Sequence, residues 1–194
     1  MKPGPEEPSQ PTVKPERRPK GWVIGAIIAV GATCLVIIVF GAILFPVFAQ
    51  ARLAANQEVS LNKLKDQSVA LLQYALDNND RFPAEAWMDG IGLYLSDEST
   101  LVSPRAEQEG LYGYAMYAPV AGTTTYAYRT PKLLVFDSSD FSRNAIGGTE
   151  LLPEEPPYQS YPFALTNGAT EAEDREQVLA YAELPVQEEG SAGP

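Results

Sequence analysis

The spacing of apolar side chains predicts one long helix that begins at Gly21. An uncharged, mostly apolar run extends from Gly21 to Ala51 and passes without a break into a segment of mixed polarity. The run has 31 residues. As a helix it would measure about 46 Å, whereas a bilayer core needs about 20 apolar helical residues. We therefore expect a transmembrane helix over 21–48 that continues outside the membrane over 49–82.

The segment 49–82 has the amphipathic pattern of a helix that lies on a sheet. Apolar and small side chains recur near helical spacing at Val59, Leu61, Leu64, Ser68, Leu71, Leu72 and Ala75. The sequence Asp77-Asn78-Asn79-Asp80 is typical of a helix end, and Phe82-Pro83 opens the next segment. The oxygens of Asp77, Asn79 and Asp80 also suit calcium, but the complete calcium-loop pattern is missing, which favours the helix end.

Two features of the apolar run bear on its fate in a membrane. Pro46 lies inside the run, where a proline removes one helical hydrogen bond, and it predicts a helix kink. Ala49-Gln50-Ala51 has the form of a signal-peptide cleavage site. The apolar part of a signal peptide, however, is typically only about 7–15 residues long, so an uncleaved anchor is favoured.

The remaining pattern predicts a small α+β domain over 83–185. Residues 84–98 indicate a short helix with Trp87, Ile91 and Leu95 turned inward, and 96–110 a polar loop. Alternation of aromatic and small residues predicts a hairpin from 111–118 and 124–130, and the apolar run 132–140 predicts a central strand. Loop follows over 141–160, and 161–168 and 177–184 indicate two closing strands. The expected fold class is therefore α+β, a long N-terminal helix packed on a small antiparallel sheet.

Charge and composition add an orientation and two tails. Residues 1–20 hold six prolines, five basic groups and no apolar periodicity, which indicates a disordered tail, and 186–194 indicates a second one. Four basic residues cluster just before the span, Lys14, Arg17, Arg18 and Lys20, against Arg52, Lys63 and Lys65 on the far side. The positive-inside rule then places the first tail in the cytoplasm and 83–185 outside it, across the inner membrane.

Composition also excludes several classes of function. Residues 52–194 carry nine basic and 22 acidic groups, and nucleic-acid binding needs a basic surface instead. The chain has no histidine and a single cysteine, Cys34, so the commonest general base and any intrachain disulfide are absent. Asp137 and Asp140 flank two serines, with no nucleophile motif or phosphate loop beside them. We expect no enzyme. A strand-end turn is the favoured interpretation of this segment, and the two carboxylates are the weaker candidates for calcium ligands.

The long helix resembles a known family. The segment from Gly41 to Pro83 is similar to the N-terminal helix of the type IV pilin and type II secretion pseudopilin superfamily. Its nearest likeness is the branch of pilin-like proteins whose C-terminal domain of unknown function carries a His-x9-Asp-Gly signature. The matching residues are Leu44 to Arg52, Leu61, Leu64, Lys65, Tyr74, Asp77, Phe82 and Pro83. The likeness extends over about residues 22–170, and it implies a pilin-like helix on a sheet.

The family's cleavage motif, membrane glutamate and signature histidine are missing. Aligned on Pro46, Ile24, Gly25 and Ala29 stand where the family has a glycine, the processed residue and a glutamate. That glutamate is costly in lipid and pairs with the freed amine of a neighbouring subunit. The signature histidine is also missing, since Asn167-Gly168-Ala169 replaces Asp-Gly-His. The resemblance therefore implies a pilin-like protein that prepilin peptidase does not process.

The expected function is that of a structural or interaction protein of the cell envelope, anchored by a single membrane pass. The bilayer is its first partner, and pilin-like subunits or assembly proteins of a type II secretion system or type IV pilus are further candidates. One alternative is a noncanonical pseudopilin subunit that still joins a filament. Another is an extracytoplasmic sensor or ligand-binding module that uses the tyrosine-rich segment 111–128.

Overall fold

The computed structural model describes residues 21–106 and 111–183. The two predicted tails, 1–20 and 186–194, lie outside the described residues. The helices are α1 (Gly21–Asp77), α2 (Trp87–Ile91) and α3 (Arg175–Glu183). The strands are β1 (Tyr114–Tyr117), β2 (Leu133–Asp137), β3 (Ile146–Gly147), β4 (Tyr161–Leu165) and β5 (Thr170–Glu173). The chain divides between Val47 and Phe48 into two units, each described by itself.

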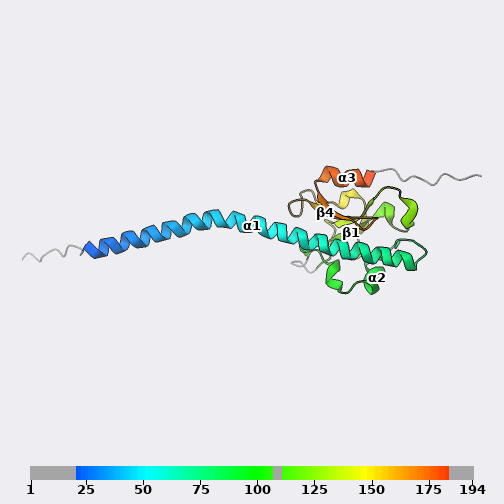
Figure 1. The fold of residues 1–194 in the computed structure, drawn as a ribbon, viewed down its shortest axis with the longest axis horizontal. Coiled ribbons are helices and arrows are strands. Elements are labelled where there is room, and N and C mark those ends of the chain that lie inside the picture. The colour runs from blue at the N-terminus through cyan, green and yellow to red at the C-terminus, as the bar shows by residue number, and fades with distance from the viewer. Residues whose placement is uncertain (1–20, 107–110, 184–194) are drawn as a thin grey trace, which may run out of the picture. The chain divides into compact units, whose positions relative to one another are not determined.

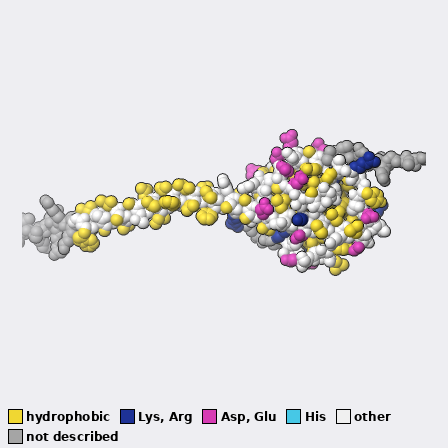
Figure 2. Space-filling model, in the orientation of Figure 1, with side chains coloured by type: hydrophobic (Ala, Val, Ile, Leu, Met, Phe, Trp, Pro, Cys, Tyr) yellow, Lys and Arg dark blue, Asp and Glu magenta, His cyan; other side chains and the backbone are white. Residues whose placement is uncertain are grey.

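The first unit contributes the apolar part of α1. Side chains from 24 to 53 are all exposed in the described chain, and hydrophobic side chains cover this part of the helix in Figure 2. A helix that is apolar all round belongs in a protein core or a membrane, not in water. α1 is long and apolar enough to cross a membrane. Pro46 lies inside α1, and the kink expected there stays a prediction.

In the second unit, α1 supplies one wall of a core. Of the predicted positions, Leu64, Ser68, Leu71 and Ala75 are buried, whereas Val59 is exposed and Leu61 and Leu72 are half-buried. The pattern did not predict the burial of Ser60, Gln67 and Ala70. The helix ends where polar residues were expected to end it. Asn79 and Asp80 adopt positive φ angles of 57° and 56°, a left-handed conformation that closes helices and that asparagine and aspartate tolerate.

The sheet lies between α1 and α3 (Figure 1). Its strand order is β3-β1-β2-β4-β5, so the apolar strand β2 is central, as predicted, and its residues are buried throughout. β2 pairs antiparallel with β1 and β4, and β4 pairs antiparallel with β5. β3 pairs parallel with β1. The fold is α+β, and the sheet is mixed rather than wholly antiparallel as expected.

The closing strand that the sequence predicted over 177–184 is wrong. Residues 177–183 belong to the helix α3. Asp174 precedes the helix, and its carboxylate accepts a hydrogen bond of 3.0 Å from Gln177 N. That bond satisfies one of the free amides at a helix start. Val178 and Ala182, one turn apart, are the buried side chains of α3. The helical spacing of Val178 and Ala182 therefore decides the structure, and not the alternation of apolar and polar residues that suggested a strand. The last strand, β5, precedes this helix in the chain.

The predicted hairpin of 111–118 and 124–130 is also wrong. β1 forms within its first half, but residues Thr125–Ala127 form a single 3-10 turn. The backbone before that turn is used to hold the chain after α1, since Phe82 N donates to Thr123 O at 2.9 Å and Gly122 N donates to Pro83 O at 3.1 Å. Thr124 forms an isolated bridge with Arg81, and Thr125 N donates to Asp80 O at 2.8 Å, so the start of this segment pairs with the chain after α1 and not with β1.

The short helix after Pro83 is confirmed in part. α2 is continued by a 3-10 turn over Gly92–Tyr94, and Trp87 and Ile91 are fully buried, while Leu95 is half-buried. The indole Nε1 of Trp87 donates to Ala145 O at 2.9 Å, which satisfies the only polar group of the ring. The loop 96–110 contains a 3-10 turn over Glu98–Leu101.

Two leucines of α1 offer a matched test of this packing. Leu71 is fully buried, whereas Leu76 is 73% exposed. Leu71→Ala should lower the free energy of unfolding by about 3 kcal/mol because it removes packed atoms and leaves a cavity. Leu76→Ala should change it by less than about 0.5 kcal/mol. Urea unfolding of the full chain in mild detergent, followed by Trp87 emission in a Trp22→Phe background, measures both; equal effects would contradict the packing described.

Candidate functional site

A charged side chain lies at the end of the central strand. Asp137 is the last residue of β2, and only 1% of it is exposed. The strand register pairs Asp137 with Tyr114 of β1, so the two side chains lie on the same face of the sheet. Ser60 of α1 contacts both of them, which identifies this face as the one that carries α1.

Four donors surround the Asp137 carboxylate. Its Oδ2 accepts hydrogen bonds from Ser60 Oγ at 3.3 Å, from Ser103 Oγ at 3.0 Å and from the Tyr158 hydroxyl at 3.2 Å. Its Oδ1 accepts from Arg105 Nη1 at 3.2 Å, which is also an ion pair. These donors come from α1 and from two loops, so the carboxylate joins segments far apart in the sequence.

Further contacts extend the group, which we call the Asp137 cluster: Ser60, Ser103, Arg105, Tyr114, Asp137 and Tyr158. Ser60 Oγ lies 3.0 Å from the Tyr114 hydroxyl. Since Ser60 donates to Asp137, it is free to accept from Tyr114. Arg105 N donates to Ser103 Oγ at 3.3 Å. The Arg105 guanidinium also stacks on the Phe141 ring, 5.3 Å from its centroid, a favourable cation–π arrangement.

A glycine lets the loops approach the cluster. Gly113, just before β1, has a φ of +82°, and a Cβ there would lie 3.1 Å from Ser103 Cβ and 3.2 Å from a ring carbon of Phe141. The backbone angle strains any larger residue there, and the close neighbours leave little room for a Cβ. Gly113 O accepts a 2.9 Å bond from Ser138 N, so the same residue fixes the end of β2.

Burial dominates the electrostatics of Asp137. Removal from water raises its pKa from 3.8 to about 6, while Arg105 and the hydroxyls of Ser103, Tyr158 and Ser60 oppose that rise. The pKa of Tyr158 is raised as well, first by burial and then by the charge of Asp137, so its phenol keeps its proton and acts as a donor. The four donors therefore offset only part of the cost of burying the charged Asp137 carboxylate.

The predicted calcium ligands have separate roles here. Asp137 is enclosed by its four donors, whereas the Asp140 carboxylate accepts a 2.8 Å bond from Ser142 N, and Asp140 N donates to Ser138 Oγ at 2.9 Å. These short-range bonds are those of a turn after a strand. Within the described ranges, no three acidic or cysteine side chains gather as a metal site would need. Calcium at this pair stays a prediction.

The other proposed oxygen ligands also have partners within the domain. Asp77 Oδ2 accepts a 2.9 Å bond from the Tyr94 hydroxyl, and Asp80 O accepts a 2.8 Å bond from Thr125 N. Asn79 and Asp80 supply the left-handed residues of the helix end. These contacts agree with the helix-end interpretation of this segment.

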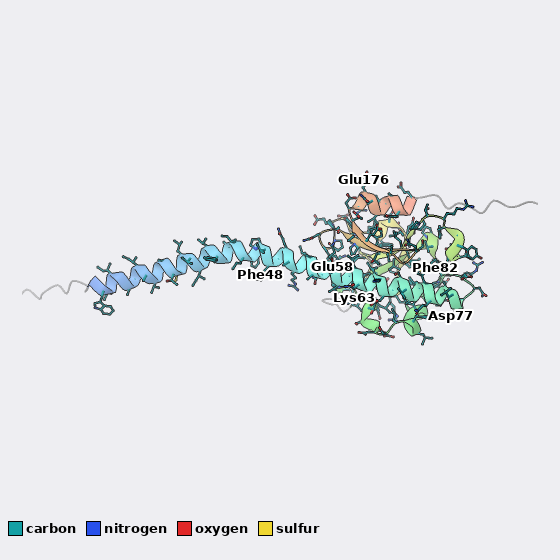
Figure 3. All side chains as sticks on the ribbon, in the orientation of Figure 1. Phe48, Glu58, Lys63, Asp77, Phe82 and Glu176 are labelled. Carbon is teal, nitrogen blue, oxygen red and sulfur yellow. The ribbon has the colours of Figure 1, made fainter. Side chains whose placement is uncertain are left out.

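Two more polar side chains join α1 to the loop that carries Ser103. Lys63 Nζ donates to Val102 O at 2.8 Å, and Gln67 Nε2 donates to Thr100 O at 2.7 Å; Figure 3 labels Lys63 on α1. Gln67 Oε1 is buried without a hydrogen-bond partner. Together with Ser60, these residues form a polar stripe on a helix face that the apolar pattern alone left unassigned.

A serine pair tests the link between α1 and the cluster. Ser60→Ala leaves the buried Tyr114 hydroxyl and Asp137 without this partner, and it should lower the free energy of unfolding by about 1–3 kcal/mol. Ser68 is equally buried but donates only to Lys65 O in its own helix, at 2.8 Å. Ser68→Ala should cost less. Urea unfolding of both variants measures the difference, and a reversed order would contradict the proposed link.

The stability of the domain should depend on the ionisation of Asp137. Because its folded pKa of about 6 exceeds the ordinary 3.8, the stabilising contribution is present below the ordinary value and is lost as pH rises through about 6. Relative to Asp137→Asn, the wild-type free energy of unfolding should fall by about 2 kcal/mol between pH 4 and pH 7. Unfolding curves of both proteins across this range measure it; parallel pH profiles would show that Asp137 is not perturbed.

We compared the chain with protein-family models, with curated proteins and with solved structures, and found no match in any of the three.

Proposed function

We propose that this chain is a membrane-anchored, pilin-like structural or interaction protein of the cell envelope. The observation that carries the proposal is that one helix, α1, has two different kinds of surface. Side chains over 24–53 are exposed and mostly apolar, whereas Ser60, Leu64 and Leu71 belong to the buried face on the sheet. A single element thus provides both an anchor and the wall of a domain.

The apolar part of α1 supports the membrane role on energetic grounds. Large side chains such as Trp22, Ile37 and Phe45 are 72%, 64% and 79% exposed. Each side chain of this kind gains about 1.5–3 kcal/mol when it leaves water, and lipid provides the apolar surroundings on every side. Backbone groups within a helix are already satisfied, which a bilayer requires.

The direction of insertion follows from the flanking charges. Four basic residues lie between Lys14 and Lys20, and the sequence after the span is acidic. Basic flanks stay in the cytoplasm, so the α+β domain lies outside it. The pilin-like part of the proposal rests on the resemblance of Gly41 to Pro83 and on the arrangement of a long N-terminal helix on a small sheet.

The N-terminus and intact mass of the protein extracted from membranes test the anchor. A chain that begins at Met1 is the expected result, because Ile24, Gly25 and Ala29 lack the processing signals of pilins. A chain that begins at Gly25 with a methylated amine would favour the filament subunit instead. A chain that begins at Arg52 and is found in the soluble fraction would overturn the anchor altogether.

Reporter fusions test the orientation. A phosphatase that is active only outside the cytoplasm is joined after residue 60, and in the matched control after residue 20, before the span. We expect activity from the first fusion and none from the second. Activity from neither fusion, with both proteins present in the membrane fraction in equal amounts, would contradict the proposed topology.

A further inference from the structure

One edge of the sheet is free in the described part of the chain. β5 pairs with β4 and with no other described strand. The hairpin that joins them is short: Gly168 N donates to Leu165 O at 2.9 Å, and Leu165 N donates to Ala169 O at 2.8 Å, with Gly168 at a φ of +83°. This is a three-residue loop with a left-handed glycine, which fixes the register of β5.

The register shows which backbone groups point away from the sheet. Pro162, which has no N–H, lies opposite Ala172. Directly opposed residues alternate between hydrogen-bonded and unbonded pairs, and Leu165 with Ala169 is a bonded one. Two and four residues along, Glu171 and Glu173 are therefore bonded to β4. The N–H and C=O groups of Thr170 and Ala172 consequently face outward.

This edge is guarded against a like strand only by its length and its charge, because β5 is short and carries two glutamates. Natural edge strands are also protected by coverage, prolines, lysines or bulges. The carboxylates of β5 oppose a second acidic strand but attract a basic one. The sequence of β5, Thr-Glu-Ala-Glu, has no proline and no lysine. Its pairing with β4 runs over four consecutive residue pairs without a shift, whereas the pairing of β2 with β4 is irregular. All four residues of β5 are half-buried, and no other described strand pairs with their outer edge.

The charge around this edge is strongly negative. Residues 170–183 carry five carboxylates and one basic side chain, Arg175, and Arg175 is turned to Pro153 O at 2.8 Å. Glu171 accepts a 3.0 Å bond from the Tyr181 hydroxyl of α3. Glu173, two residues along, lies on the same face of the sheet. Figure 2 shows acidic side chains gathered on this side of the domain, and Figure 3 labels Glu176 there.

A hollow in the surface adjoins this acidic edge. It is lined by Asp174, Glu176, Gln177, Ala180 and Tyr181. Because Tyr181 contacts Glu171 of β5, the hollow lies beside the strand and could receive long side chains from a neighbouring strand. The outward backbone groups of β5, the acidic side chains around it and the hollow beside it therefore lie at the same edge of the sheet.

We propose that β5 accepts an extended, basic segment of another envelope protein as a sixth strand. Backbone bonds to Thr170 and Ala172 would give affinity, as in other cases of strand addition. Lysine or arginine side chains at alternate positions would meet Glu171 and Glu173. A second copy of this chain is disfavoured, because its own acidic edge would place like charges opposite one another. The proposal deepens the interaction role proposed above, and it rests on that role.

The test uses the full chain in nanodiscs of neutral phosphatidylcholine. The probe is a fluorescent ten-residue peptide of alternating lysine and threonine, measured by anisotropy at low salt, with empty nanodiscs as a blank. We expect binding that weakens with salt. A copy of the peptide N-methylated at alternate residues keeps the charge but loses backbone donors, and it should bind at least tenfold more weakly. Equal binding of both peptides, or no binding, would overturn the strand addition.

Variants locate the site. The pair Glu171→Gln and Glu173→Gln should weaken peptide binding at least tenfold. The control pair Glu58→Gln and Asp66→Asn removes the same charge from exposed positions of α1 and should change binding less than twofold. Equal losses in both pairs would show a general effect of charge and overturn the site.

Hydrogen exchange measures the protection of backbone amides, which charge attraction alone does not change. The amides of Thr170 and Ala172 should gain protection when the peptide binds. Protection of these amides without peptide, rising with protein concentration, would show that a second copy is the occupant and overturn the basic partner. Failure of the peptide to bind leaves the membrane anchor intact, since the N-terminal mass and the fusions test that separately.

Discussion

Burial of one helical stripe against the central strand is the constraint on which this domain depends. α1 places Leu64, Leu71 and Ala75 in the core, and β2 is buried along its whole length. Burial of these apolar surfaces drives the packing, but it also encloses whatever polar groups the two elements carry. Ser60, Gln67 and Asp137 are all buried as a result.

These buried polar groups determine how α1 is positioned on the sheet. An apolar stripe can slide or rotate on a sheet with modest loss, whereas a buried carboxylate with four donors has one satisfactory position. The Asp137 cluster requires α1, β1, β2 and the loops around Ser103 and Tyr158 to be in place together. Burial supplies most of the stability, and the cluster selects the geometry.

The sequence predicts correctly those helices and strands whose apolar spacing fits only one kind of secondary structure. α1 follows from its long periodicity, and β2 and β4 follow from short apolar runs. The segment 177–184 fits two periods, and the cap from Asp174, a contact outside that segment, decides for a helix. Thr124 to Thr130 favours a strand by composition, but the backbone just before the 3-10 turn is engaged by Phe82 and Pro83. In the first case a local helix cap decides, and in the second a tertiary contact overrides the local preference.

The site was predictable only in its central residue. Asp137 draws attention in the sequence because it ends the most apolar strand, yet its partners Ser60, Ser103 and Tyr158 are ordinary surface types with no shared motif. Their convergence depends on the sheet register and on the close approach at Gly113. Distances of this kind arise from the folded chain and leave no local pattern to detect.

The side chains that join α1 to its domain also have a mechanical consequence. Tension on the chain from the first unit enters the second at Phe48. Along α1 it then meets Gln57, Ser60, Lys63 and Gln67, each of which bonds to another segment. Four such bonds on successive turns would share a pulling force in shear with Leu64, before the force reaches the core residues Leu71 and Ala75.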